Sequence, residues 1–93
     1  MTSINQLASE IRKQADRLFP HRTDNSMYLK VYEEVAELIQ CRGSSSELAD
    51  LIIMILDFGA RRNYDIETVV REKMILNDQR EWREVDGVMH HIE

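Results

Sequence analysis

The sequence predicts an all-α protein of four helices, and three observations support this prediction. Apolar residues recur at steps of three and four along most of the chain, which is the period of a helix. The 93 residues include three glycines and one proline, and so few helix breakers favour long helices over many short strands. Hydrophobic residues make up 43% and charged residues 31%, a balance typical of a globular protein rather than a disordered one.

We expect one domain over residues 1–93, with helices at about 3–19, 26–41, 45–62 and 66–80 and a tail at 81–93. The first helix ends at Phe19-Pro20, because the residue before a proline avoids the helical region. The tail carries Asp86-Gly87, a turn signal that predicts a small hairpin or a folded-over segment.

Capping residues precede each later helix. The second has several candidates, and the third begins with the Ser-x-x-Glu pattern of a capping box. The candidates are Asp24, Asn25 and Ser26 for the second helix, Ser44 with Glu47 for the third, and Asp65 for the fourth.

Composition excludes several classes of protein. The 12 Lys and Arg residues stand against 17 Asp and Glu residues, for a net charge of −5, which disfavours binding to a nucleic acid backbone. The longest apolar run, Leu51–Leu56, is far shorter than the ~20 residues that cross a bilayer. The N-terminus lacks the pattern of a signal peptide, and a lone cysteine, Cys41, excludes an internal disulfide. We therefore expect a cytoplasmic protein that binds neither membranes nor nucleic acid polymers.

The third predicted helix is apolar on nearly every side, as Leu51–Leu56 shows, and should be the central one. A chain this short buries only roughly 60–70% of its unfolded surface. We therefore expect a four-helix bundle that is completed by oligomerisation into a homo-oligomer.

Acidic residues occupy two of the predicted helices. Glu33, Glu34 and Glu37 form an E-E-x-x-E pattern, and at about 100° per residue their side chains share one side of the second helix. Glu47 and Asp50 lie three residues apart at the start of the third helix, so they are neighbours on one face. Packing the two helices antiparallel would point these carboxylates at one another.

Carboxylates at this density repel one another unless a cation lies among them. Mg²⁺ takes oxygen ligands and is commonly shared between carboxylates and substrate phosphates. The pattern therefore predicts a Mg²⁺ or Mn²⁺ site for a phosphorylated ligand. The alternative is neutralisation by salt bridges from Arg12, Arg17, Arg61 or Arg62. Asp57 and Arg61, four residues apart, are expected to pair with each other.

A basic stripe on the fourth predicted helix supplies candidate phosphate ligands. Lys73, Asn77 and Arg80 lie within roughly 60° of one another around that helix, and they can hold phosphate oxygens by charge-assisted hydrogen bonds. Trp82 follows closely and could stack on a base. Lys30 is a weaker candidate for a phosphate contact.

The order of these elements resembles the MazG-like family of all-α nucleoside triphosphate pyrophosphohydrolases. The matching segments run through the two acidic motifs, the end of the third predicted helix and the basic stripe, and they cover about two thirds of the chain. They are Leu29–Leu38, Glu47–Leu51, Ala60–Glu67, Glu72–Met74, Asn77, Arg80 and Trp82.

The resemblance implies hydrolysis of a nucleoside triphosphate between its α- and β-phosphates, giving a monophosphate and pyrophosphate. It implies that Mg²⁺, for which Mn²⁺ can substitute, is held by Glu34, Glu37, Glu47 and Asp50. Glu33 would bind a further metal or help to deprotonate the attacking water, so Glu33 and Glu34 are the catalytic candidates. The resemblance assigns phosphate binding to Lys73, Asn77 and Arg80.

The compact length and the Asp-Gly tail look like small phage-type members of the family, which favours deoxynucleotides as substrates and the host cytoplasm as the location. Family members assemble as dimers or tetramers. Many have glycine where this chain has Ala36. The alternatives are a non-catalytic helical oligomerisation module and a nucleotide sensor that binds without turnover.

Overall fold

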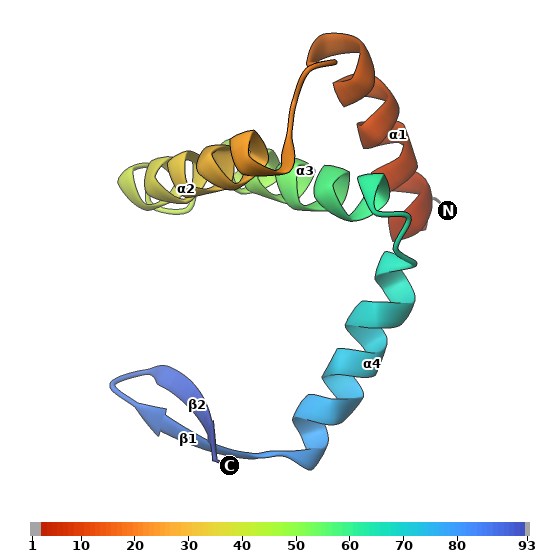
Figure 1. Ribbon diagram of the computed structural model, residues 1–93. Coiled ribbons are helices and arrows are strands. Elements are labelled where there is room, and N and C mark those ends of the chain that lie inside the picture. The colour runs from red at the N-terminus through yellow and green to blue at the C-terminus, as the bar shows by residue number, and fades with distance from the viewer. Residues whose placement is uncertain (1–2, 93) are drawn as a thin grey trace.

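The structure is a computed structural model that describes residues 3–92, and over this range it contains four helices and one two-stranded hairpin (Figure 1). The predicted all-α class is confirmed. The outermost positions of the predicted domain, residues 1–2 and 93, lie outside the described residues. The elements are α1 Ile4–Leu18, α2 Asp24–Gln40, α3 Ser45–Arg61, α4 Ile66–Gln79, β1 Glu81–Val85 and β2 Val88–Ile92.

Side-chain caps fix the starts of the helices. The Ser44 hydroxyl accepts from the Glu47 backbone N–H, and Asp65 accepts from the Thr68 backbone N–H at 3.1 Å, as predicted for these two helices. The prediction for α2 was wrong, because its N-cap is Thr23. Thr23 has an extended backbone and exchanges hydrogen bonds with Ser26, so the helix starts at Asp24, two residues before the predicted start at residue 26.

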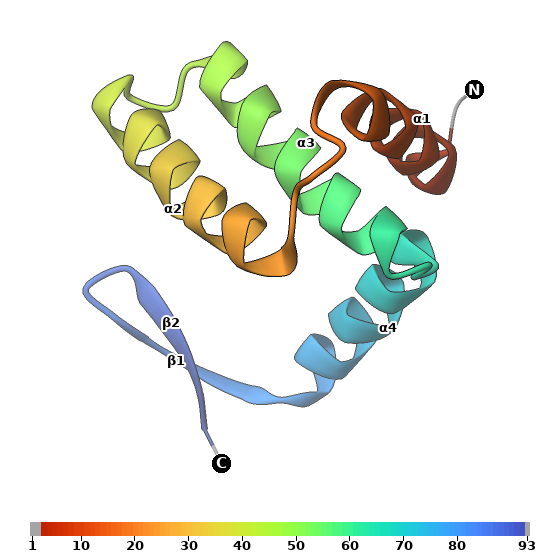
Figure 2. The ribbon, with the colours of Figure 1, turned by 45° about the horizontal axis from the view of Figure 1, so that its top comes forward.

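Helices α2 and α3 form an antiparallel pair, with α1 packed on the other side of α3 (Figure 2). The turn between α2 and α3 is short, and Arg42 and Gly43 take left-handed backbone angles in it, with φ of 53° and 73°. Helix α3 is therefore central, as predicted. Its apolar residues Ile52, Ile53 and Ile55 nevertheless remain exposed in a single chain.

The buried apolar core is small. Among the described residues it consists of Ala8, Met27, Leu56 and Ile66. Gly59 lets α4 begin against α3, because a Cβ atom at Gly59 would lie 3.0 Å from Cδ1 of Ile66. This close approach fixes the point at which the chain leaves the three-helix body.

Helix α4 and the hairpin form an arm that extends away from α2 and α3 (Figures 1 and 2). Asp86 and Gly87 turn the hairpin with φ of 51° and 79°, the geometry expected of an Asp-Gly hairpin turn. Every residue of both strands is exposed. The radius of gyration is 15.5 Å, against the roughly 12 Å expected for a compact chain of this length.

A buried ion pair ties the α1–α2 connection to α3. Arg22 donates to Asp57 through Nε at 2.8 Å and Nη2 at 2.9 Å, and Nη2 also reaches Asp16 at 2.8 Å. The side chains of Arg22 and Asp57 are 10% and 5% exposed. The predicted pairing of Asp57 with Arg61 is therefore wrong: Arg61 points to the start of α2, where it lies 3.7 Å from Asp24.

Replacing Arg22 by methionine should destabilise the protein by about 3–5 kcal/mol, because Asp57 would be left as a buried, unpaired charge. Urea unfolding at a fixed protein concentration measures this loss. Glu67→Gln is the control, since the Glu67–Arg71 pair is exposed and 3.9 Å apart, and it should change the free energy of unfolding by less than about 1 kcal/mol. Equal effects of the two changes would contradict a structural role for the Arg22–Asp57 pair.

Candidate metal centre

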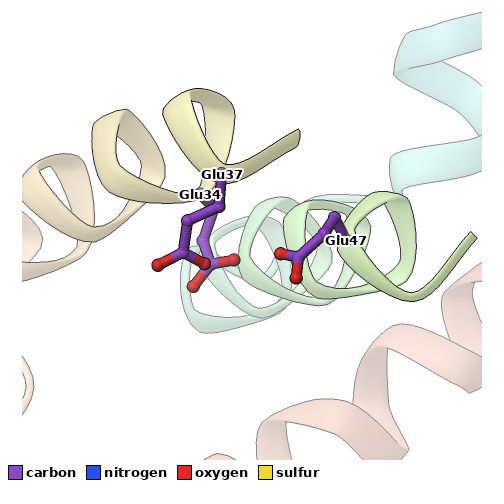
Figure 3. A group of neighbouring side chains, drawn as sticks. All are labelled: Glu34, Glu37 and Glu47. Atoms are coloured by element: carbon purple, nitrogen blue, oxygen red, sulfur yellow. The ribbon is translucent and has the colours of Figure 1, made fainter. Parts of the chain in front are cut away.

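Three glutamates converge between α2 and α3. Glu34 and Glu37 lie one turn apart on α2, and Glu47 lies in the first turn of α3 (Figure 3). One carboxylate oxygen from each side chain can be chosen so that all three lie within 4.8 Å of one another. The antiparallel pairing across the short turn brings these residues together, as the spacing of the two acidic motifs predicts.

Two of the three carboxylates, those of Glu34 and Glu47, each have a buried oxygen without a hydrogen-bond partner. Oε2 of Glu34 and Oε2 of Glu47 are both buried, and neither has a hydrogen-bond partner. A buried carboxylate oxygen without a donor is costly. A divalent cation between the helices would satisfy both oxygens and relieve the repulsion among the three charges. The donor set, made only of oxygens, fits Mg²⁺ or Mn²⁺.

Lys30 is the cation at the edge of this group. Its ammonium lies 3.2 Å from Oε2 of Glu33 and 3.4 Å from Oε1 of Glu34. Hydrogen bonds to Glu33 and then to Glu34 raise the pKa of Lys30. Lys30 thus neutralises the outer oxygen of Glu34, while the inner oxygen stays unpartnered.

Three of the four arginines proposed as alternative partners for the acids bind elsewhere in the described residues. Arg12 donates to the Ala60 carbonyl at 3.1 Å. Arg62 pairs with Asp24 at 2.7 Å, and Arg61 lies near the same carboxylate. For these three arginines, the structure therefore favours the metal-site interpretation over neutralisation by ion pairs.

The remaining acidic candidates lie beside the group. Asp50 is exposed on α3, one turn after Glu47, and it is not among the three residues whose oxygens come together. Glu33 is exposed on α2 and binds Lys30. Their roles as metal ligand and catalytic residue stay predictions.

The basic stripe and Trp82 lie on the arm. Trp82 donates from Nε1 to the Asn77 carbonyl at 2.7 Å, and its ring packs in a T-shaped arrangement with the His91 ring, with the ring centroids 5.7 Å apart. Asn77, Arg80 and Trp82 line a hollow of about 390 Å³ at the junction of α4 and the hairpin. Helix α4, which also carries Lys73, runs away from the α2–α3 pair in both ribbon views (Figures 1 and 2). The single chain therefore does not bring this stripe and the carboxylates together.

One feature of the site was missed by the sequence analysis. A mainly apolar groove between α1, α2 and α3 opens next to Lys30. Its apolar residues lie on α1, α2 and α3 or directly after α1, and each belongs to the ordinary apolar pattern of its own segment, so no local sequence signal identifies the groove.

The fold and the site together define an all-α protein whose carboxylate centre, built on an antiparallel helix pair, suits a divalent cation. No helix among residues 3–92 is long and apolar enough to span a membrane.

Comparison with known proteins identifies relatives that are nucleotide hydrolases. The chain is 39% identical over 80 residues to a dATP/dGTP diphosphohydrolase of Salmonella phage PMBT28, although it spans only 28% of that protein. It is 31% identical over 93 residues to a dATP/dGTP diphosphohydrolase of Cyanophage S-2L and covers 89% of it. A comparison with protein-family models finds no match.

A solved structure is similar over nearly the whole chain. It is the Cyanophage S-2L MazG-like pyrophosphohydrolase, bound to dGDP and three catalytic Mn²⁺ ions per active site. The TM-score is 0.89 at 31% identity, over 99% of this chain and 94% of that one. The chain belongs to the MazG-like pyrophosphohydrolase family, and the predicted resemblance is confirmed.

Replacing Glu37 or Glu47 by glutamine should abolish Mn²⁺ binding, because each change removes one charged ligand from the centre. Electron paramagnetic resonance of free Mn²⁺ measures binding without any need for turnover. Mn²⁺ should also raise the melting temperature of the unmodified protein and leave that of either variant unchanged. Glu67→Gln, the same substitution on α4, should retain binding. Normal Mn²⁺ affinity in both site variants would place the ion elsewhere.

Proposed function

We propose that this protein hydrolyses deoxynucleoside triphosphates, with dATP and dGTP as its first candidates, between the α- and β-phosphates in the presence of Mg²⁺. The products are a deoxynucleoside monophosphate and pyrophosphate. The observation that carries the proposal is the pair of buried, unpartnered oxygens on Glu34 and Glu47. The names of the phage relatives support the substrate class and favour an enzyme over a non-catalytic module. The same relatives support placement in the host cytoplasm, where these nucleotides are found.

The residues have distinct roles in this proposal. Glu34, Glu37 and Glu47, with Asp50 beside them, hold the divalent cations. When bound, these ions neutralise phosphate charge and lower the pKa of a bound water. Glu33 lies on the solvent side of the group and accepts the proton of the attacking water. Lys30, which already reaches Glu33 and Glu34, turns to a phosphate oxygen when the cations take over those carboxylates.

We further propose that the active enzyme is a homo-oligomer in which the arm of one copy completes the site of another. An isolated two-stranded hairpin is marginal in water, yet every residue of both strands of this one is exposed. Helix α4 also exposes apolar side chains, among them Val70, Met74 and Ile75. A complementary apolar surface exists on α2 and α3, where a groove of about 570 Å³ is lined by Tyr28, Val31, Tyr32, Val35, Ile55 and Phe58.

Seating the arm against a second copy would cover both surfaces. It would also carry the basic stripe out of its own chain and toward the carboxylates of the partner. Lys73, Asn77 and Arg80 would then bind the phosphates that the cations orient. This arrangement explains why a single chain is more extended than a compact domain of its length.

Incubation of dGTP with the protein and Mg²⁺ should release dGMP and pyrophosphate in equal amounts, with no dGDP at any time. Ion-exchange chromatography of the products measures this directly. Glu34→Gln should reduce the rate by at least about 10²-fold, since the buried ligand is lost. Accumulation of dGDP with inorganic phosphate would mean that the protein cleaves between the β- and γ-phosphates, and this result would overturn the proposal.

Mixing two inactive variants tests whether the arm acts on its partner. Glu37→Ala disables the carboxylates of one chain, and Lys73→Ala disables the arm of the other. If the arm acts between subunits, an equal mixture exchanged into dimers should recover about a quarter of the wild-type activity, because half of the dimers contain one intact site. If carboxylates and arm act within one chain, the mixture should stay inactive. Size-exclusion chromatography with light scattering confirms that the variants exchange as oligomers.

A further inference from the structure

Helix α4 meets the three-helix body at its N-terminal end, and the rest of the arm runs away from α2 and α3 (Figures 1 and 2). Ile66, the first residue of α4, is buried in the core with Ala8 and Leu56. This apolar contact fixes where the helix begins. A helix that is held at one buried side chain can still change its direction, so the placement of its later residues depends on a second attachment.

The side chain of Asn5 supplies this second attachment. From the first turn of α1, its Nδ2 donates to Oδ1 of Asp65 at 2.8 Å, and its Oδ1 accepts from the backbone N–H of Glu67 at 3.2 Å. Asp65 is the N-cap of α4, and Glu67 lies in the first turn of that helix. Among residues 3–92, the hydrogen bonds from α1, α2 or α3 to this turn come from Asn5 alone.

An amide suits both contacts, because it is a donor and an acceptor at once. The backbone N–H of Glu67 is one of the donors that the start of a helix leaves unpaired. The hydrogen bond from Asn5, followed by those from Thr68, lowers the pKa of Asp65. The capping carboxylate is therefore ionised at neutral pH, which strengthens the bond that Asn5 donates to it.

We propose that Asn5 is a positioning residue for hydrolysis: its two hydrogen bonds set the direction of α4 and so place Lys73, Asn77 and Arg80 against the phosphates. The inference rests on the proposed function, which assigns phosphate binding to the arm. Asn5 acts through α4 and not by touching the substrate, since its amide is already bound to Asp65 and Glu67.

Asn5→Asp tests this role with a change of one terminal group. The aspartate cannot donate to Asp65, and it sets a second carboxylate against the first. A negative charge in the first turn of a helix is favourable, so α1 itself should stay folded. Gln6→Asp is the matched control, because Gln6 is exposed, lies beside Asn5 in the same turn and gains the same charge.

Asn5→Asp should lower kcat/KM for dGTP at least about tenfold, because a small misplacement of positioning groups is costly in rate. Mn²⁺ affinity, measured by electron paramagnetic resonance, should not change, because Glu34, Glu37 and Glu47 lie outside the arm. A general loss of folding would lower both quantities together. Gln6→Asp should alter neither.

A reciprocal exchange tests the contact itself. Asn5→Asp combined with Asp65→Asn again sets one carboxylate against one amide, and asparagine is also a good N-cap. The double variant should recover most of the kcat/KM that Asn5→Asp loses, since residues in direct contact have non-additive effects. Additive losses would contradict a direct contact between Asn5 and Asp65.

The lone tryptophan and the lone cysteine report the direction of the arm without turnover. Trp82 lies in β1, and Cys41 is exposed at the end of α2. A dansyl group on Cys41 accepts excitation energy from Trp82. At a matched oligomeric state, checked by light scattering, Asn5→Asp should change the efficiency of transfer. Gln6→Asp should leave the efficiency unchanged, and the double variant should restore it.

Three results would overturn the inference and leave the proposed function standing. They are unchanged energy transfer in Asn5→Asp, changed transfer with normal kcat/KM, and a parallel loss of Mn²⁺ affinity and turnover. If the unmodified protein does not hydrolyse dGTP, the proposed function is rejected, and with it the role of Asn5 in hydrolysis. The energy transfer then still decides whether Asn5 sets the direction of α4.

Discussion

Three carboxylates within 4.8 Å of one another repel, and the rest of the molecule holds them together against that repulsion. The short turn at Arg42 and Gly43 reverses the chain, so that Glu34 and Glu37 on α2 face Glu47 on α3. Apolar contacts along the helix pair supply the opposing free energy, because the acids occupy one end of the pair while α3 continues with the apolar run Leu51–Leu56. The metal-free protein thus stores an unfavourable electrostatic interaction that a divalent cation converts into a favourable one.

The Arg22–Asp57 pair joins three helices. Arg22 belongs to the connection between α1 and α2, and Asp57 lies on α3, so one interaction positions elements from three helices. The same two side chains form part of the groove wall. A pair that supports the fold therefore also shapes the surface of this groove.

Much of this architecture follows from local sequence patterns. Helix period, capping residues and the spacing of the two acidic motifs predict the four helices and the meeting of Glu34, Glu37 and Glu47. Long-range partners could not be predicted in this way. Arg22 lies 35 residues from Asp57, and nothing near Asp57 distinguishes Arg22 from the closer Arg61. The start of α2 was missed because the Thr23 side chain caps the helix by accepting from the Ser26 backbone N–H, before the apolar pattern begins. The groove depends on three helices at once and has no local signature.

The contact between Gly59 and Ile66 lies at the start of α4, so a small change in the angle of the helix at this point moves its far end by a larger distance. Helix α4 has 14 residues, so it is about 21 Å long at 1.5 Å per residue, and a tilt of about 10° at its start moves its far end by about 4 Å. Such a displacement is larger than a hydrogen-bond length. A Cβ atom at Gly59 would crowd the end of the Ile66 side chain, and either that side chain or the start of α4 would have to shift. The close contact at Gly59 therefore contributes to the position of Asn77 and Arg80, more than a dozen residues away along the chain.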